Sequence, residues 1–151
     1  LTDEKRSFKR YYSSSDINGK YLIRVLESKN KEETEADYTY VHFFLPFDSP
    51  PNDGNLYVFG ALSGWNCKKE NQLQYNYQRS GYEASLYLKQ GYYNYEYVFL
   101  KDGERAADET FIEGTHFETE NDYAIYVYYH AFGTFYDQLI ATKRFNSVKM
   151  Y

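Results

Sequence analysis

The stretch YEASLYLKQGYYNYEYVFLKDG, residues 82–103, decides the fold class. Its first eight residues alternate between two faces, as a half-buried β-strand does. One face carries apolar side chains: Tyr82, Ala84, Leu86 and Leu88. Gln90 and Gly91 then predict a tight turn, and the dipeptide Asp102-Gly103 predicts a second turn. We expect the two runs on either side of Gly91 to pair as an antiparallel hairpin.

The rest of the chain repeats this pattern of short alternating runs closed by turn signals. Further strands are predicted at 8–13, 21–27, 38–47, 56–62, 73–78, 124–132 and 138–145. Such spacing is typical of an all-β protein, an immunoglobulin-like two-sheet β-sandwich of about eight to ten strands. We expect residues 1–151 to form a single domain, excised from a longer protein, with residues 1–15 as a linker or an edge strand.

The composition supports β structure and excludes some partners. Twenty tyrosines and eleven phenylalanines make 21% of the chain aromatic, and tyrosine fits a half-buried pleated surface. A net charge of −5 without a basic stripe argues against nucleic-acid binding. No apolar run reaches the roughly 20 residues that a membrane-spanning helix needs.

The sequence contains no recognisable catalytic or metal site. His42 and His130 lie inside predicted strands without a second ligand at metal-binding spacing. His116 lies in an acidic loop that lacks the alternating order of a calcium-binding loop. Cys67 has no disulfide partner or evident base, although Lys68 next to it would slightly lower a thiol pKa. We expect a protein that is not an enzyme and needs no cofactor.

The single tryptophan, Trp65, ends the run LYVFGALSGWN at residues 56–66. This run and the hairpin ending in Asp102-Gly103 resemble the glycogen- and starch-binding sandwich modules. That resemblance implies an early-set immunoglobulin-like fold, with Trp65 as one platform for a sugar. The sequence departs from that family at Glu96, where the family has a lysine, and at Arg105, where the family has a second tryptophan. Glycan binding is therefore the alternative function, and it requires a second exposed ring such as Tyr57, Tyr95 or Tyr97.

A second resemblance covers nearly the whole chain. The blocks SFKRYYSSSDINGKYLIR, ADYTYVHFFLP, GNLYVFGALSGWN, FIEGTHFETENDYAIYVYYH and YDQLIATKRFNS are similar to the later part of the type IX secretion system plug family of Bacteroidota. The resemblance implies a periplasmic protein associated with the outer membrane, which closes a translocon barrel and performs no catalysis. The expected partners are that barrel and a neighbouring domain of the same chain.

The residues expected at an interaction surface come from the Trp65 turn, from the turn after Gly103 and from the acidic loop at 113–123. They are Trp65, Asn66, Arg105, Glu113, His116, Glu118, Asn121 and Tyr123. An aromatic ring at a loop tip suits an anchor in a partner's pocket. We expect the acidic loop to be exposed next to aromatic side chains.

Overall fold

The computed structural model describes residues 1–7, 17, 19–25, 34, 36–116 and 121–147. Contacts between Cα atoms divide the chain into two compact units, Leu1–Thr115 and His116–Tyr151. The organisation of residues 1–151 as one domain stays a prediction, and each unit is described separately here.

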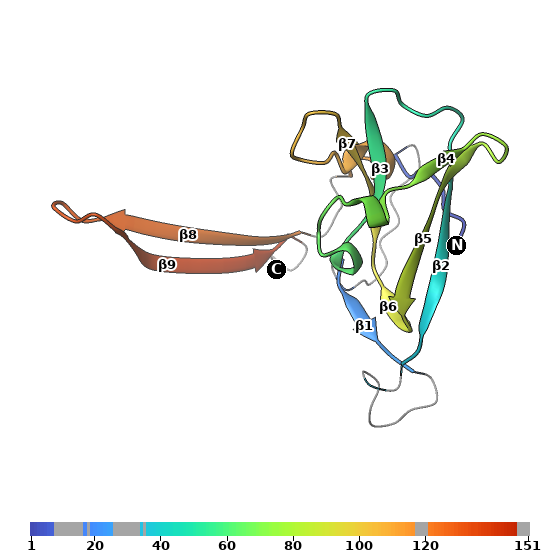
Figure 1. The fold of residues 1–151 in the computed structure, drawn as a ribbon. Coiled ribbons are helices and arrows are strands. Elements are labelled where there is room, and N and C mark those ends of the chain that lie inside the picture. The colour runs from blue at the N-terminus through green and yellow to red at the C-terminus, as the bar shows by residue number, and fades with distance from the viewer. Residues whose placement is uncertain (8–16, 18, 26–33, 35, 117–120, 148–151) are drawn as a thin grey trace. The chain divides into compact units, whose positions relative to one another are not determined.

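The first unit is an all-β sandwich (Figure 1). Its strands are β1 (Tyr21–Ile23), β2 (Tyr38–Pro46), β3 (Gly54–Phe59), β4 (Gln74–Asn76), β5 (Gly81–Lys89), β6 (Gly91–Tyr93) and β7 (Glu96–Lys101). Its described residues also form two short 3₁₀ turns, Ala61–Ser63 and Lys69–Asn71, and the helix α2 (Thr110–Glu113). All strand pairs are antiparallel: β2-β5-β4 form one sheet, β3 pairs with β7, and β1 pairs with β6.

The core lies between the β2-β5-β4 sheet and the β3-β7 pair. Inward residues of all four long strands form one apolar cluster with Leu73 and Ile112: Phe43, Leu45, Leu56, Val58, Tyr82, Leu86, Tyr97 and Phe99. The predicted inward face of β5 is confirmed, because Tyr82 and Leu86 are buried while Ala84 and Leu88 pack against the cluster. The all-β sandwich prediction is therefore confirmed.

The predicted pairing of residues 82–89 with the run after Gly91 is wrong. β2 pairs along the whole of one edge of β5, and on the other edge β4 pairs with Gly81, Tyr82 and Glu83. Gly91 instead lies against Leu22, so closely that a Cβ atom there would come within 2.5 Å of the Leu22 carbonyl oxygen. The chain leaves the sheet at this point, pairs as β6 with β1, and then pairs as β7 with β3.

The N-terminal residues add to the outer edge of β2. Thr2 forms a parallel bridge with Phe44, and the Asp3 N–H donates to the Phe44 carbonyl at 2.8 Å. Farther on, the N–H groups of Arg6 and Ser7 both donate to the Ile112 carbonyl. The expected strand at 8–13 lies outside the described residues.

The second unit is a long hairpin of β8 (Asp122–His130) and β9 (Asp137–Asn146). A register shift between Val127 and Tyr128 leaves Ile140 as the extra residue of a β-bulge in β9. Every residue of β8 is exposed, and so are the first eight residues of β9. Within the described residues, these two strands pair only with each other.

The sandwich core predicts a large loss of stability when its side chains are shortened. Leu56 is completely buried, so Leu56→Ala should lower the free energy of unfolding by about 2–5 kcal/mol. Leu22 is half exposed, so Leu22→Ala should cost less than about 1 kcal/mol. Denaturant unfolding followed by tryptophan fluorescence measures both, and equal losses would contradict the assignment of the core.

Candidate functional site

Trp65 sits in a tight turn that follows β3. Its backbone has a positive φ of 57°, and its N–H donates to the Gly60 carbonyl at 3.0 Å. The indole ring meets Phe59 edge to face, with ring centroids 5.6 Å apart. The indole also lies against Gly19, where an added Cβ atom would overlap it. Trp65 thus remains half exposed while it joins the turn at Gly19 to the end of β3.

Asn66 stabilises the same turn through its side chain and its backbone. Its Nδ2 donates to the Gly64 carbonyl, and its own carbonyl accepts from Nδ2 of Asn71. Asn71 is buried and also donates to the Val58 carbonyl of β3. The amide side chain of Asn71 therefore links the Trp65 turn to β3.

The rings expected to complete a sugar platform with Trp65 are not available for that role. Tyr57 and Tyr97 are buried. Tyr95 is partly buried, and its hydroxyl donates to Oδ2 of Asp3 at 2.8 Å. Burial raises the pKa of Tyr57, and the charges of Cys67 and Asp102 add to that rise. Trp65 therefore lacks the second ring that the sequence suggested for it.

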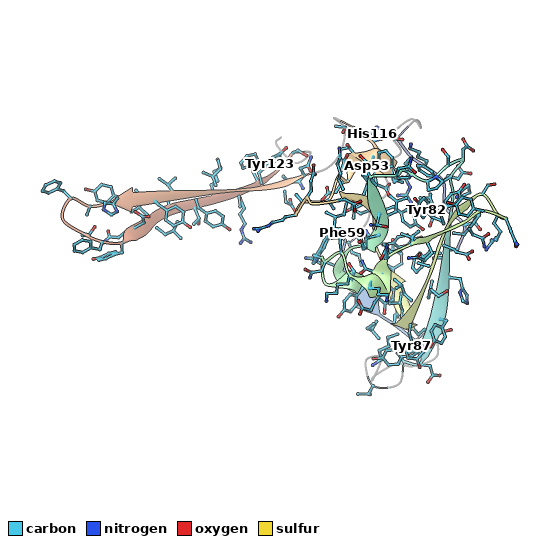
Figure 2. All side chains as sticks on the ribbon, turned by 45° about the horizontal axis from the view of Figure 1, so that its top comes forward. Asp53, Phe59, Tyr82, Tyr87, His116 and Tyr123 are labelled. Carbon is cyan, nitrogen blue, oxygen red and sulfur yellow. The ribbon has the colours of Figure 1, made fainter. Side chains whose placement is uncertain are left out.

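A different aromatic group lies on the outer surface of β2 and β5. Tyr87 stacks on Tyr38 with centroids 5.2 Å apart and meets Tyr40 at 4.9 Å. All three rings are more than half exposed, and Tyr87 is labelled in Figure 2. Next to them is an open hollow of about 660 Å³, lined by Tyr40, Leu62, Ser63, Gly64, Lys68, Glu70, Asn71, Ser85, Leu86, Tyr87 and Leu88. Its walls thus combine two rings with hydroxyl, ammonium and carboxylate groups.

Glu113 belongs to the support of the fold rather than to an exposed patch. Its Oε1 accepts from the Tyr97 N–H at 3.0 Å, and its Oε2 pairs with Arg6 at 3.3 Å. Only 17% of its side chain is exposed, and burial raises its pKa. The expectation that the acidic loop begins with an exposed Glu113 is wrong, because the first turn of that segment is the helix α2, which packs on β7.

The remaining predicted residues are spread over both units. Arg105 is exposed in the loop after the Gly103 turn. His116 begins the second unit and is partly buried, whereas Glu118 lies outside the described residues. At the base of the hairpin, Asn121 exchanges hydrogen bonds with Ser147, and Tyr123 stacks on Phe145 at 5.2 Å. Within each unit the described members of this set form no single cluster.

The hairpin tip carries two aromatic side chains that the sequence analysis missed. Phe132 and Phe135 are both fully exposed. The turn between them is well formed, because the N–H and Oγ1 of Thr134 both donate to the Ala131 carbonyl. Gly133 supplies the positive φ of 81°. The signal in the sequence is the string AFGTFY, a glycine turn with phenylalanine on both sides.

The described residues contain no group of three or more histidine, cysteine or acidic side chains suited to a metal ion. Nδ1 of His42 lies 2.7 Å from the Ser85 hydroxyl, and Nδ1 of His130 lies 2.9 Å from Asp137. Burial raises the pKa of the Cys67 thiol, so the expected lowering by Lys68 is wrong. No helix in the described part of the chain is long and apolar enough to span a membrane.

The carboxyl group of Glu96 makes the first unit sensitive to pH. Burial raises its pKa to about 7, and the nearby charges of Glu109 and Glu113 add to the rise. The folded state therefore binds a proton more tightly than the unfolded state, and this stabilisation is lost as the pH rises from about 4.5 to about 7.

Glu96→Gln should raise the free energy of unfolding by about 1 kcal/mol at pH ~8, a value reduced for partial solvent screening, and should have little effect at pH ~4. Glu104, which is exposed, gives the matched control Glu104→Gln. Urea unfolding at both pH values makes the comparison. A gain at low pH, or the same gain for both variants, would contradict the assignment.

Comparison with solved structures finds similar chains. No family model and no curated protein match the chain. The crystal structure of a hypothetical protein from Parabacteroides merdae is similar, with a TM-score of 0.84 and 38% sequence identity. The match covers 97% of this chain but 36% of that protein. The chain thus shares its all-β fold with part of a longer bacterial protein.

Proposed function

We propose that this chain is a non-catalytic protein-interaction domain of a type IX secretion plug-like protein, which docks to an outer-membrane translocon from the periplasmic side. The observation that carries the proposal is the exposed aromatic hairpin, β8 and β9. The block resemblance to the plug family supports the choice of partner and of compartment.

The hairpin has an apolar face that no described residue of its own unit covers. Paired residues of an antiparallel ribbon point to the same side, so the register sets Tyr123 beside Phe145 and Val127 beside Ala141. This apolar face consists of Tyr123, Ile125, Val127, Tyr129, Ala141 and Phe145, with Gln138 and Lys143 among them. Figure 2 shows side chains along both sides of the ribbon. An isolated two-stranded hairpin is marginally stable in water, so a partner that buries this face would stabilise it.

The tip of the hairpin adds two exposed aromatic side chains to this apolar surface. Phe132 and Phe135 have no apolar neighbours to bury them in the hairpin, and exposed aromatic anchors of this kind commonly dominate the energy of protein interfaces. A pocket or wall of a barrel protein would take these two rings. A neighbouring domain of the same polypeptide is the competing partner for the same surface.

Replacing both tip rings tests this function. Phe132→Ser with Phe135→Ser should reduce binding to the purified translocon barrel at least about tenfold, because each lost anchor costs about 1–2 kcal/mol or more. The matched control is Tyr77→Ser, which removes a strongly exposed ring from the first unit. Binding is measured by surface plasmon resonance with the periplasmic side of the barrel accessible. Equal affinity of wild type and the tip variant, or no binding by wild type, would reject the proposal.

A second candidate, glycan binding, is favoured by the hollow beside Tyr40 and Tyr87. Exposed rings can stack on sugar faces, while Lys68, Glu70 and Ser85 offer donors and acceptors for hydroxyl groups. Such a site is distinct from the Trp65 platform that the resemblance to starch-binding modules suggested.

Electrophoresis in gels that contain starch or glycogen tests this candidate. If the hollow binds glycans, wild type should be retarded, Tyr87→Ala should lose most of the retardation, and Tyr92→Ala should keep it, since Tyr92 is equally exposed but outside the hollow. Wild-type mobility identical to that in plain gels would remove this function for the two polymers tested.

A further inference from the structure

The outer edge of β8 carries a row of backbone groups that no strand among the described residues pairs with. The seven residues from Tyr123 to Tyr129, YAIYVYY, include no charge, glycine or proline. Natural proteins commonly protect such edges with charged residues, proline or bulges. A long uncharged edge of this composition is therefore suited to strand pairing.

The outer edge of β9 is protected in the usual ways. It contains the bulge at Ile140 and two consecutive cations, Lys143 and Arg144. Both features hinder the addition of another strand. The two edges of the same hairpin thus differ, and only the β8 edge is open to pairing.

The hydrogen bonds at the base of the hairpin show which β8 groups point outward. The Ser147 N–H donates to the Asn121 carbonyl at 2.8 Å, so this pair belongs to the bonded kind. Bonded and non-bonded pairs alternate along an antiparallel ladder. It follows that Tyr123, Ile125 and Val127 bond to β9, whereas the backbone N–H and C=O groups of Ala124 and Tyr126 point to the open edge.

We infer that β8 pairs antiparallel with β8 of a second copy of this chain, in a register centred on Tyr126. In that register Tyr126 opposes itself and Ala124 opposes Tyr128. The outward-pointing backbone N–H and C=O groups of Ala124 and Tyr126 therefore meet hydrogen-bond partners on the second copy. Ile125 opposes Val127, and Tyr123 opposes Tyr129, so the apolar faces of the two copies join on one side. These cross-strand pairs each contribute a few tenths to about 1 kcal/mol.

The charge pattern favours the register centred on Tyr126 and a second copy of this chain as the partner. The two charged or titratable ends of β8, Asp122 and His130, oppose each other across the two-fold axis, and the residues between them are neutral. Nδ1 of His130 already lies 2.9 Å from Oδ1 of Asp137, so in this register the imidazole ring would have a carboxylate on each side. A strand of unrelated sequence has no reason to match both ends. The pairing also closes upon itself, because it leaves only the protected β9 edges outside.

This contact is independent of the proposed docking to a translocon. It uses backbone groups at the strand edge, and it leaves the apolar face and the tip rings Phe132 and Phe135 accessible. A strand of nine residues is about 30 Å long, and pairing along one edge buries less than the roughly 800 Å² per partner of a typical stable complex. The dimer should therefore dissociate on dilution.

Proline substitutions on the two edges test the inference. Tyr126→Pro removes an N–H at the open edge, and Thr142→Pro is the matched control, since Thr142 is the direct partner of Tyr126 on β9. By sedimentation equilibrium, wild type and Thr142→Pro should approach twice the monomer mass with rising concentration, while Tyr126→Pro should stay monomeric. A wild type that is monomeric throughout, or a dimer that Tyr126→Pro leaves intact, would overturn the inference.

Cysteine cross-linking checks the register without disturbing the ladder. In a Cys67→Ser background, Tyr126→Cys would place two thiols across the axis with Cα atoms about 5.5 Å apart, within the range for a disulfide. Mild oxidation should link Tyr126→Cys several-fold faster than Thr142→Cys. Equal rates would mean that β8 meets other occupants or none, and would also reject the pairing of two copies.

Discussion

The hydroxyl group of Tyr97 is the constraint on which the first unit depends. Its ring is 1% exposed in the middle of the core, so the hydroxyl must find an acceptor inside the protein. Asp3 provides it at 2.7 Å and accepts from Tyr95 with the same oxygen. Burial, reinforced by this carboxylate, raises the pKa of both tyrosines. The Asp3 N–H also donates to the Phe44 carbonyl, so the hydrogen bonds from Tyr95 and Tyr97 to the Asp3 carboxylate help to hold the N-terminal segment on β2.

The two units differ in the surroundings that they give to their tyrosine side chains. In the sandwich, a partly buried tyrosine such as Tyr75 packs against the apolar cluster, and its hydroxyl donates to the carbonyls of Phe47 and Asp48. In the hairpin, rings such as Tyr126 and Tyr128 remain about half exposed or more. A surface of this kind gains free energy when a second molecule covers it, which is why we place the interactions of this protein in β8, β9 and their connecting turn.

Local patterns predicted the strands better than they predicted the partners of the strands. The alternation in β5 correctly separated Tyr82 and Leu86 from Ser85 and Tyr87, because side-chain direction in a strand has a period of two. The turn at Asp102-Gly103 was also correct, with Gly103 at a φ of 83°. The hairpin across Gly91 was wrong, because a turn signal does not reveal which strand the following residues pair with, and here they pair with β1 and β3. The candidate sugar platform shows the same limit: Trp65 is half exposed, but Tyr57 and Tyr97, two of the rings expected to complete the platform, are buried.

The sequence by itself determined the all-β class, the main strands and the lack of a recognisable catalytic motif. These follow from alternation, turn residues and residue types, which act over a few neighbours in the chain. Only the tertiary structure decided which tyrosines are buried, that Glu113 supports Tyr97, that Tyr38, Tyr40 and Tyr87 gather beside a hollow, and that β8 and β9 form a separate hairpin. Those outcomes depend on contacts between distant segments, which compete for the same strand edges and the same apolar surface. A tyrosine can pack its ring in the core or leave it exposed with its hydroxyl in water. Whether a given tyrosine is buried therefore cannot be determined from its neighbours in the chain.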